Sequence, residues 1–509
     1  MGRVIGIDLG TTYSGVAVVN DLGRPEMLLN RDGEATTPSV VLFQSDSPLV
    51  GTMAKRSAVT APLDVVEFVK RAMGDASFRF DSTEGRSYRA EEVSALILKR
   101  LKEDAELALG EPVTEAVVTV PAYFEDAHRK ATMDAGAIAG LDVLRVLNEP
   151  TAAALAYGLT TGFNGTALVY DLGGGTFDVT ILRIADGSFD IVATGGDRNL
   201  GGFTWDNELM RLLNERFVAA GGPDLLADEE SEAMLRERAV LAKHSLSTVE
   251  RTRVVLGAGG VNRTIELPRS DFAEATASLV SRTRELTEMV RDDAGLTWAD
   301  IDRVLLVGGS TRMPAVRAMV DSAIARPVER RINPDEVVAL GAAVQARLIE
   351  SERGAAPDLT INGHRVAIGD VTSHGLGTFA RNPLTGQLEN TVIIPHNTRI
   401  PAKRPGYFST IRDGQSEVDV EVTVGDDADP DFVRNVTGDK PLRVRIPPYP
   451  AGAPIEIIYA YDIDQTIFVE VNDLTANQSL GTFEVSNIAN MSRDQVAAAA
   501  EQMRDIEVG

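Results

Sequence analysis

Residues 4–12 read Val-Ile-Gly-Ile-Asp-Leu-Gly-Thr-Thr, and residues 167–178 read Ala-Leu-Val-Tyr-Asp-Leu-Gly-Gly-Gly-Thr-Phe-Asp. Each stretch begins with an apolar run, which is typical of a buried strand, and a second β-rich run follows at residues 14–19 and 177–182. The sequence therefore predicts two hairpins, each built as strand, Gly-Thr turn and strand. Glycine lets the backbone N–H groups at such a tip approach a phosphate closely.

Two aspartates, Asp8 and Asp171, stand directly before the two turns, at the ends of the predicted strands. A carboxylate in this place can hold Mg²⁺ through water. Two such hairpins facing each other would grip one triphosphate from both sides. The pair of motifs therefore points to ATP hydrolysis.

A third glycine turn completes the predicted pocket. The apolar run 304–307 leads into Gly-Gly-Ser-Thr-Arg-Met-Pro at residues 308–314, and a helical stretch follows. A strand–Gly-Gly–helix turn suits the sugar and base of a nucleotide. None of the three turns matches G-x-x-x-x-G-K-[ST], so the sequence does not predict a Walker-type site.

Length and composition limit the class of protein. The chain has 509 residues, enough for two to four domains, and its 44% of hydrophobic residues supports a proper core. The 50 basic and 75 acidic residues give a net charge of −25, which argues against a nucleic-acid partner and favours simple solubility. Because cysteine is absent, disulfides, thiol catalysis and cysteine-ligated zinc are excluded. The five histidines show no ligand spacing.

We expect a cytoplasmic protein with no membrane partner. The first apolar run is too short for a signal peptide, because Asp8 interrupts it. No apolar stretch approaches the roughly 20 residues of a membrane span. The absence of cysteine fits a reducing cytosol.

The pattern of elements predicts a large first domain over residues 1–353. Strand-like and helix-like segments alternate there, and a βββα order occurs twice, which suits two lobes around a cleft. We expect lobe one at about 1–165 and lobe two at about 166–353. Inserts at about 20–90 and 200–300 would form the outer part of each lobe.

A break near residue 353 begins a linker, which we place at 354–371. Alternating runs then predict strands at 417–424, 442–446, 455–459 and 466–471, as in an antiparallel β-sandwich over 372–490. The end, 491–509, holds one short amphipathic helix with a Ser492 cap.

The three turns, in this order, resemble those of the actin-like ATPase superfamily, and within it the seventy-kilodalton heat-shock chaperone family. Further matching stretches are Val-Pro-Ala-Tyr-Phe at 120–124, Asn-Glu-Pro-Thr-Ala-Ala-Ala at 148–154, the glycine pairs of 195–202 and Asn-Pro-Asp-Glu at 333–336. The resemblance is dense to about residue 350 and weaker to about 490. It implies an α/β actin-like ATPase domain of two lobes, followed by an antiparallel β-sandwich.

The resemblance implies catalytic roles for Lys70, Glu149, Thr176 and Asp178. Lys70 would lie near the γ-phosphate, neutralise developing charge and orient water, and Glu149 would position water. Their bland alternatives are a surface lysine and an acid at a helix N-terminus. Replacing Lys70 by alanine is expected to leave the fold intact. Asp8 and Asp171 would hold Mg²⁺, and Asp178 would belong to a water and potassium site.

The resemblance also implies a set of residues that hold ATP or ADP. They are Gly10, Thr11, Thr12, Gly173, Gly174, Gly175, Gly201, Gly202, Lys243, Ser247, Gly308, Gly309, Ser310, Arg312 and Asp335. Arg312 would stack on adenine. Two positions depart from the family pattern. Val240 stands where a ribose-binding Glu is usual, which would remove a hydrogen bond worth roughly 0.5–1.5 kcal/mol. Thr204 stands where an Asp is usual.

Other matches imply communication between domains. Pro121 and Arg129 match a pair that relays nucleotide state, although ordinary loop and helix placement is the alternative. Arg145, Asn148 and Asp370 match positions that meet J-domain co-chaperones.

The predicted linker departs from the leucine-rich pattern of the family. Ala367 and Gly369 replace large apolar anchors, so weaker docking of the linker is expected.

In the β-sandwich, Phe408, Ile411 and Val418 match walls of a peptide groove, with plain core packing as the alternative. The family's long helical lid is almost entirely missing, and 491–509 would be its rudiment.

The chain is thus identified as a lid-truncated chaperone that binds unfolded polypeptide, with a J-domain protein and a nucleotide-exchange factor as partners. The alternatives are an ATP-gated regulator with one dedicated partner and, less favoured, a sugar kinase.

Overall fold

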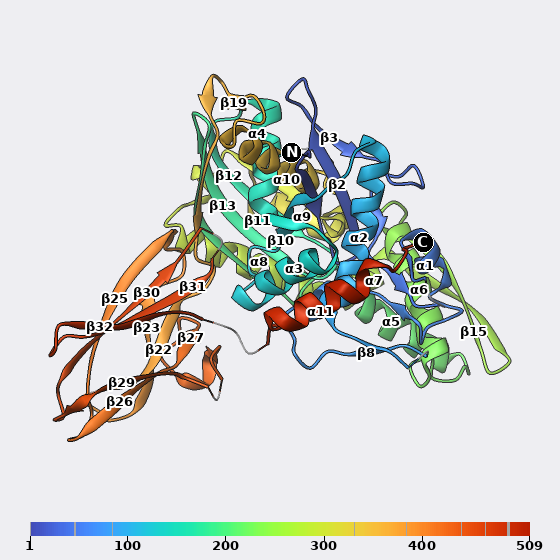
Figure 1. Cartoon of the computed structure of the whole chain (residues 1–509). Helices are drawn as coiled ribbons and strands as arrows, with labels where there is room; N and C mark the ends of the chain where they lie inside the picture. The colour runs from blue at the N-terminus through green and yellow to red at the C-terminus, as the bar shows by residue number, and fades with distance from the viewer. Residues whose placement is uncertain are drawn as a thin grey trace.

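A computed structural model of the chain describes residues 2–44, 47–83, 85–329, 331–382, 384–438, 440–463, 465–485 and 489–509. Two α/β lobes are followed by a strand-rich C-terminal part, called here the β module (residues 372–485) (Figure 1). In the described ranges, no helix has both the length and the apolar character needed to cross a membrane.

The sheet of lobe one has the strand order β11-β10-β1-β2-β3, with β4 beside β2. Its strands are β1 (Ile5–Asp8), β2 (Tyr13–Val19), β3 (Pro25–Leu28), β4 (Thr37–Pro38), β10 (Glu115–Val120) and β11 (Asp142–Asn148). β1 runs parallel to β10 and antiparallel to β2, so the first glycine turn joins neighbouring strands, as predicted. Helices α2 (Ala90–Leu109) and α3 (Asp126–Ile138) share one apolar core with this sheet.

Lobe two repeats this arrangement. Its sheet has the order β18-β17-β12-β13-β14, in which β12 is parallel to β17 and antiparallel to β13. The strands are β12 (Gly165–Leu172), β13 (Phe177–Ala185), β14 (Ser188–Asp197), β17 (Arg303–Val307) and β18 (Val328–Glu329). The second glycine turn therefore occupies the place in lobe two that the first turn occupies in lobe one.

Two helices, α4 (Glu149–Thr161) and α10 (Val337–Glu352), fill the space between the sheets and pack closely through small residues. A Cβ at Gly341 would lie 1.7 Å from the carbonyl oxygen of Ala152, and one at Gly6 would lie 2.1 Å from the backbone N of Ala343. Glycine is required at both crossings, because any side chain would force the elements apart.

The remaining described elements form the outer parts of the lobes. In lobe one they are β5 (Val41–Leu42), β6 (Leu49–Val50), α1 (Thr52–Ser57), β7 (Val65–Val66), the 3₁₀ helix η1 (Val69–Ala72), β8 (Phe80–Asp81) and β9 (Ser87–Tyr88). In lobe two they are α5 (Gly202–Ala219), α6 (Glu229–Leu246), β15 (Arg251–Ala258), β16 (Val261–Pro268), α7 (Arg269–Ala275), α8 (Ala277–Asp293), η2 (Trp298–Asp300), η3 (Gly309–Arg312) and α9 (Pro314–Ala323).

The stretch predicted as a linker forms strands on the ATPase lobes. A short hairpin, β19 (Thr360–Ile361) and β20 (His364–Arg365), is followed by β21 (Ala367–Val371), which pairs in parallel with the edge strand β14. A Cβ at Gly369 would lie 2.6 Å from Asp190 Oδ1 and 2.9 Å from Arg399 Nη2, which form an ion pair. Gly369, which the sequence presents as a lost anchor, thus makes room for this close approach.

The β module contains three small sheets around one apolar core. Its strands are β22 (Leu376–Arg381), β23 (Leu388–Ile394), β24 (Arg399–Ile400), β25 (Ala402–Ser409), β26 (Gln415–Val420), β27 (Val422–Val424), β28 (Arg434–Asn435), β29 (Leu442–Tyr449), β30 (Pro454–Tyr461), β31 (Ile467–Asp473) and β32 (Gln478–Glu484), with η4 (Pro430–Phe432) before β28. The four alternating runs predicted as strands lie in β26, β27, β29, β30 and β31, so these strand predictions are confirmed. One strand, β24, pairs with β21 and extends the sheet of lobe two.

The last helix, α11 (Arg493–Arg504), begins at the Ser492 cap, whose Oγ accepts a hydrogen bond from Gln495 N. It lies on lobe one beside α3, and Figure 1 shows it running across that lobe, with the C-terminus next to α1. Its buried residues Ala499 and Met503 belong to the core of lobe one. The sequence pattern predicts the helix but not this location.

Candidate nucleotide site

The tips of the two glycine hairpins meet between the lobes. A Cβ at Gly174 would lie 2.5 Å from Thr12 Cγ2, and one at Gly175 would lie 2.6 Å from Thr11 Oγ1. Only glycine permits this contact, and the backbone N–H groups of both turns are thereby gathered in one place.

Four carboxyl groups gather beside the two turns. Asp8 ends β1, Asp171 lies near the end of β12, Asp178 lies on β13, and Glu149 is the first residue of α4. Burial and the Glu149 carboxyl raise the pKa of Asp8 to about 7 and that of Asp178 to about 7, and the same two causes push the pKa of Asp171 well above its usual range. Their ionised forms are therefore disfavoured in the protein alone, and a cation beside them would stabilise those forms.

Two lobe-one groups orient these carboxyls. Thr119 Oγ1 donates to Asp8 over 2.9 Å, and the backbone N of Tyr123 donates to Asp178 Oδ1 over 2.9 Å. Sequence reasoning named neither residue as a site residue. The Val-Pro-Ala-Tyr-Phe motif gave a partial signal, because it begins directly after Thr119.

Lys70 is the positive group of the cluster. It lies in η1 with only 4% of its surface exposed, and its Nζ donates to Glu149 Oε1 over 2.5 Å. Phe68, the residue before η1, has the left-handed φ of 59°, a conformation that costs energy in a residue with a side chain. The surface-lysine alternative is therefore wrong, and Glu149 is both a helix N-terminal acid and the partner of Lys70.

The donor set suits Mg²⁺. Carboxylates at the ends of β1 and β12 are oxygen ligands, and their raised pKa values indicate a place where a cation would be stabilised. Within the described ranges, no three His, Asp or Glu side chains group so as to hold a metal ion by themselves. Mg²⁺ commonly keeps several waters and binds substrate phosphates, which matches carboxylates that act through water.

The second turn is held by the N-terminus of α5. Gly202 N donates to the Gly173 carbonyl over 2.9 Å, and Phe203 N donates to the Gly174 carbonyl over 2.8 Å. Gly201 packs so closely that a Cβ there would lie 2.4 Å from the carbonyl carbon of Gly175. In this arrangement the Gly202 amide binds the turn, whereas the resemblance gives it a phosphate contact.

Thr204 stabilises the same helix start. Its Oγ1 donates to the Asn199 carbonyl over 3.0 Å and accepts from Gly201 N over 3.3 Å. A threonine at this place satisfies backbone groups that the helix cannot satisfy itself. Thr204, which replaces the family's usual Asp, therefore keeps a polar role at this position.

The third glycine turn and α6 lie next to the second turn and α5. Ser310 Oγ donates to the Gly173 carbonyl over 2.9 Å, and Gly308, with a φ of 80°, would place a Cβ 2.3 Å from the Leu172 carbonyl oxygen. Lys243 Nζ is buried and donates to Asp206 over 2.8 Å. The structure therefore brings the third turn against the second, as the motif order predicts.

The other adenosine candidates lie on η3 and at the end of α6. Arg312 Nη2 donates to Asp335 over 2.5 Å, and its side chain is about half exposed. Ser247 Oγ donates to the Lys243 carbonyl over 3.1 Å. Val240 lies on α6 one turn before Lys243 and is half-buried, so it is not a core residue.

Comparison with known proteins identifies the family. The Hsp70 protein family matches residues 4–83 and 75–507, nearly the whole chain. The chain belongs to the Hsp70 family. The members of this family are nucleotide-binding ATPases and chaperones, and the mixed α/β structure of two equivalent lobes fits their actin-like ATPase fold.

One cluster of this Hsp70 was not foreseen from the sequence. Phe203 of lobe two is flanked by two guanidinium groups, with Arg71 of lobe one 4.4 Å and Arg236 of lobe two 4.8 Å from its ring centre. Phe68 of lobe one contacts the same ring at 4.8 Å between centres. The two lobes therefore touch directly beside Lys70. No pattern in the sequence signals such a contact.

The interdomain candidates of this Hsp70 form a connected chain of contacts. Arg129 on α3 donates to Asn148 Oδ1, and Asn148 Nδ2 donates to both carboxylate oxygens of Asp370 over 2.9 and 3.2 Å. Asn148 directly precedes Glu149, so this series of contacts begins beside the catalytic candidates. Burial raises the pKa of Asp370, and the charge of Arg145, which lies in β11, offsets part of this rise. Pro121 starts a tight turn, in which its carbonyl accepts from Phe124 N.

The β module of this Hsp70 docks on both lobes. Ser373 Oγ donates to the Ala122 carbonyl over 2.5 Å, and Thr194 N donates to Asn397 Oδ1 over 3.1 Å. An ion pair joins Arg434 to Glu125.

The peptide-groove candidates lie apart from the nucleotide site. Phe408 and Val418 are half-buried and pack against the core of the β module, which is the core alternative stated above. Ile411 is 65% exposed, as a groove wall would be. Their role in binding peptide stays a prediction.

Proposed function

We propose that this chain is an ATP-dependent molecular chaperone that couples ATP hydrolysis to the binding and release of extended polypeptide segments. Membership of the Hsp70 family supports the proposal. The observation that carries it is the contact of Asn148, the residue before Glu149, with Asp370 on the strand that leads into the β module.

The buried charges support the hydrolytic step. Lys70, placed beside Glu149, would neutralise charge that develops on the transferred phosphoryl group. Glu149, Thr176 and Asp178 would orient the attacking water, because their side chains are buried beside the turns and their oxygens can accept hydrogen bonds from it. Mg²⁺, held through water by Asp8 and Asp171, would supply further positive charge at the phosphate oxygens, and a potassium ion would lie near Asp178.

The hydrogen bonds from Arg129 to Asn148 and from Asn148 to Asp370 would couple the nucleotide state to the β module. A change in the position of Glu149 on binding ATP would move Asn148, and with it the contact to Asp370. β21 holds Asp370 against lobe two through its pairing with β14. Two arrangements of this strand would then have different affinity for peptide in the module, which is a population shift.

We also propose that the surface around Arg145, Asn148 and Asp370 receives a J-domain protein, and that a nucleotide-exchange factor is a further partner. Because α11 packs on lobe one, it does not cover the β module, and peptide bound there would exchange fast even with ADP present.

Steady-state ATP hydrolysis by the full chain, measured with several unrelated unfolded peptides, tests the proposal. Stimulation by most of them supports a general chaperone, and response to one protein partner alone supports the dedicated regulator. Lys70→Ala should lower the rate by about 10²-fold or more, and Lys102→Ala should keep it, because Lys102 pairs with Glu106 on the surface of α2. No hydrolysis by the unaltered chain would refute the proposal.

A further inference from the structure

The end of the chain is built into lobe one. Residues 489–509, called here the strap, contain α11 and the residues around it. Met491, Ala499, Met503 and Val508 of the strap are each less than one-tenth exposed and belong to the apolar core that contains β1 and α2. The strap therefore covers part of the lobe-one core rather than the β module.

A lysine of α2 holds the C-terminal end of the helix. Lys99 Nζ donates to the carbonyls of Met503, Arg504 and Ile506 over 2.9, 3.1 and 2.6 Å. The last carbonyls of a helix have no partner within the helix, and a cation there also interacts favourably with the helix dipole. The α2 surface thus supplies what the end of α11 lacks.

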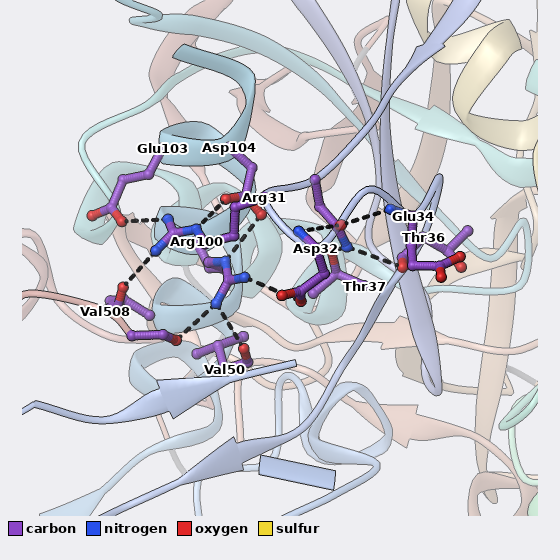
Figure 2. Close-up of polar contacts among 12 residues, drawn as sticks. Arg31, Asp32, Glu34, Thr36, Thr37, Val50, Arg100, Glu103, Asp104 and Val508 are labelled. Atoms are coloured by element: carbon purple, nitrogen blue, oxygen red, sulfur yellow. Dashed lines mark hydrogen bonds and ion pairs between the residues drawn. The ribbon is translucent and has the colours of Figure 1, made fainter. Parts of the chain in front are cut away.

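Two arginines hold the residues beyond the helix. Arg100 Nη1 donates to the carbonyls of Val50 and Gly509 over 2.9 and 2.8 Å, and Arg31 Nη1 donates to the Val508 carbonyl over 3.2 Å. Figure 2 shows both guanidinium groups directed at Asp104, which accepts from each of them. Arg100 and Asp104 are both buried in this arrangement, and Asp104 holds the two guanidinium groups beside the strap.

The strap also joins the inner and outer parts of lobe one. Gly509 N donates to the Pro48 carbonyl over 3.1 Å, and Val50 N donates to the Gly509 carbonyl over 3.0 Å. These bonds place Gly509 directly beside β6. β6 belongs to the small sheet that also contains β7, and η1 with Lys70 follows β7.

The β module is therefore attached to the ATPase lobes at both ends. β21 fixes its entry on lobe two, and the strap begins at Ala489, whose carbonyl accepts from Arg89 Nη2 on lobe one. Only four peptide links separate Val485 from Ala489. They span at most about 15 Å, since consecutive Cα atoms lie 3.8 Å apart.

We propose that residues 489–509 are a strap that stays bound to lobe one in every nucleotide state and keeps the β module next to the ATPase lobes. The strap is then a fixed part of the ATPase domain and not a rudiment of a lid. Nucleotide would change the orientation of the module, but it would not release the module from the lobes. The part of this proposal that concerns nucleotide rests on the proposed function, whereas the attachment of the strap to lobe one does not.

Distances between two spin labels test the strap. The chain has no cysteine, so Glu111→Cys on lobe one and Ser416→Cys on the β module would carry the only labels, and both positions are exposed. The unaltered strap should give one distance population without nucleotide, with ADP and with ATP. A second, longer population with ADP in this protein would overturn the proposal.

A matched pair of substitutions tests the cause. Ala499→Glu puts a charge on the buried face of α11 and should add a longer population, whereas Ala498→Glu, on the exposed face, should leave the distances unchanged. Lys99→Ala, which removes three capping bonds without touching the core, should act in the same direction as Ala499→Glu. Equal distances in all three variants would refute the strap. Titration with a fluorescent ATP analogue separates this outcome from a failure of the proposed function, because a chain that binds no ATP can still show the attachment.

Discussion

Lys70→Met should destabilise the nucleotide-free protein, as well as slow hydrolysis. Lys70 Nζ lies 2.5 Å from Glu149 in a buried place, so its removal leaves a buried carboxylate without its partner. Breaking a buried ion pair on one side costs about 3–5 kcal/mol of unfolding free energy. The sequence alone led us to expect an intact fold for a Lys70 variant, and the structure revises that expectation.

The loss should depend on pH, and the sign follows from the neighbours of Lys70. The pKa of Asp8 and of Asp178 is raised to about 7, so between about pH 4 and pH 7 the folded state binds protons that the unfolded state does not. Unfolding free energy therefore falls as pH rises through this window. Lys70 lowers both pKa values, so its loss should widen the window and make Lys70→Met cost more at pH 8 than at pH 6.

Urea unfolding of the nucleotide-free protein at both pH values measures this effect. Lys102→Met is the matched control, since its surface pair with Glu106 is worth only about 0–1 kcal/mol. The double variant Lys70→Met/Glu149→Gln should recover part of the loss, because the unpaired carboxylate is gone. A loss for Lys70→Met no larger than that of Lys102→Met, at both pH values, would refute the reasoning.

Three further predictions concern the affinity for ATP, the attacking water and the docking of the β module on the lobes. Val240→Glu should strengthen ATP binding by roughly 0.5–1.5 kcal/mol, as measured by calorimetry, since Val240 is half-buried one helical turn before Lys243. Unchanged affinity would mean that the new carboxylate does not reach the ribose. Thr176→Ala should slow single-turnover hydrolysis and keep Mg·ATP affinity, because its hydroxyl would orient water; lost affinity in an equilibrium titration would contradict that role. Burial lowers the pKa of His374 to about 4, and its Nε2 lies 3.3 Å from the Tyr123 carbonyl, so the docked β module binds fewer protons than a free one between about pH 4 and 6.5. The free energy of docking the β module on the lobes should therefore become less favourable by about 1.4 kcal/mol for each pH unit below 6.5. Fluorescence transfer between lobe one and the module should show this, and His374→Gln should remove most of the dependence.

Much of the fold could be predicted from local sequence patterns. The two hairpins could be predicted because a short apolar run, an Asp and a glycine turn are all local, and the alternating runs of the β module gave its main strands for the same reason. The gathering of Lys70 with Glu149 followed only from the resemblance, since 79 positions separate them. No local periodicity brings such residues together.

Other features depend on contacts that no sequence pattern contains. Gly369 looks like a lost apolar anchor in the sequence, yet it gives room to the ion pair of Asp190 with Arg399. The amphipathic pattern predicts α11 but cannot tell which apolar surface it will cover. Phe203 between Arg71 and Arg236 likewise depends on the closure of the two lobes.

Single-turnover hydrolysis of ATP, with and without unrelated extended peptides, tests the central claim most directly. We expect the full chain to hydrolyse ATP, several peptides to accelerate the reaction, and Lys70→Ala to lower the rate by about 10²-fold or more, the usual loss for a group that stabilises transition-state charge. A Lys70→Ala rate within about threefold of the unaltered protein, or no response to any of the peptides, would contradict the account.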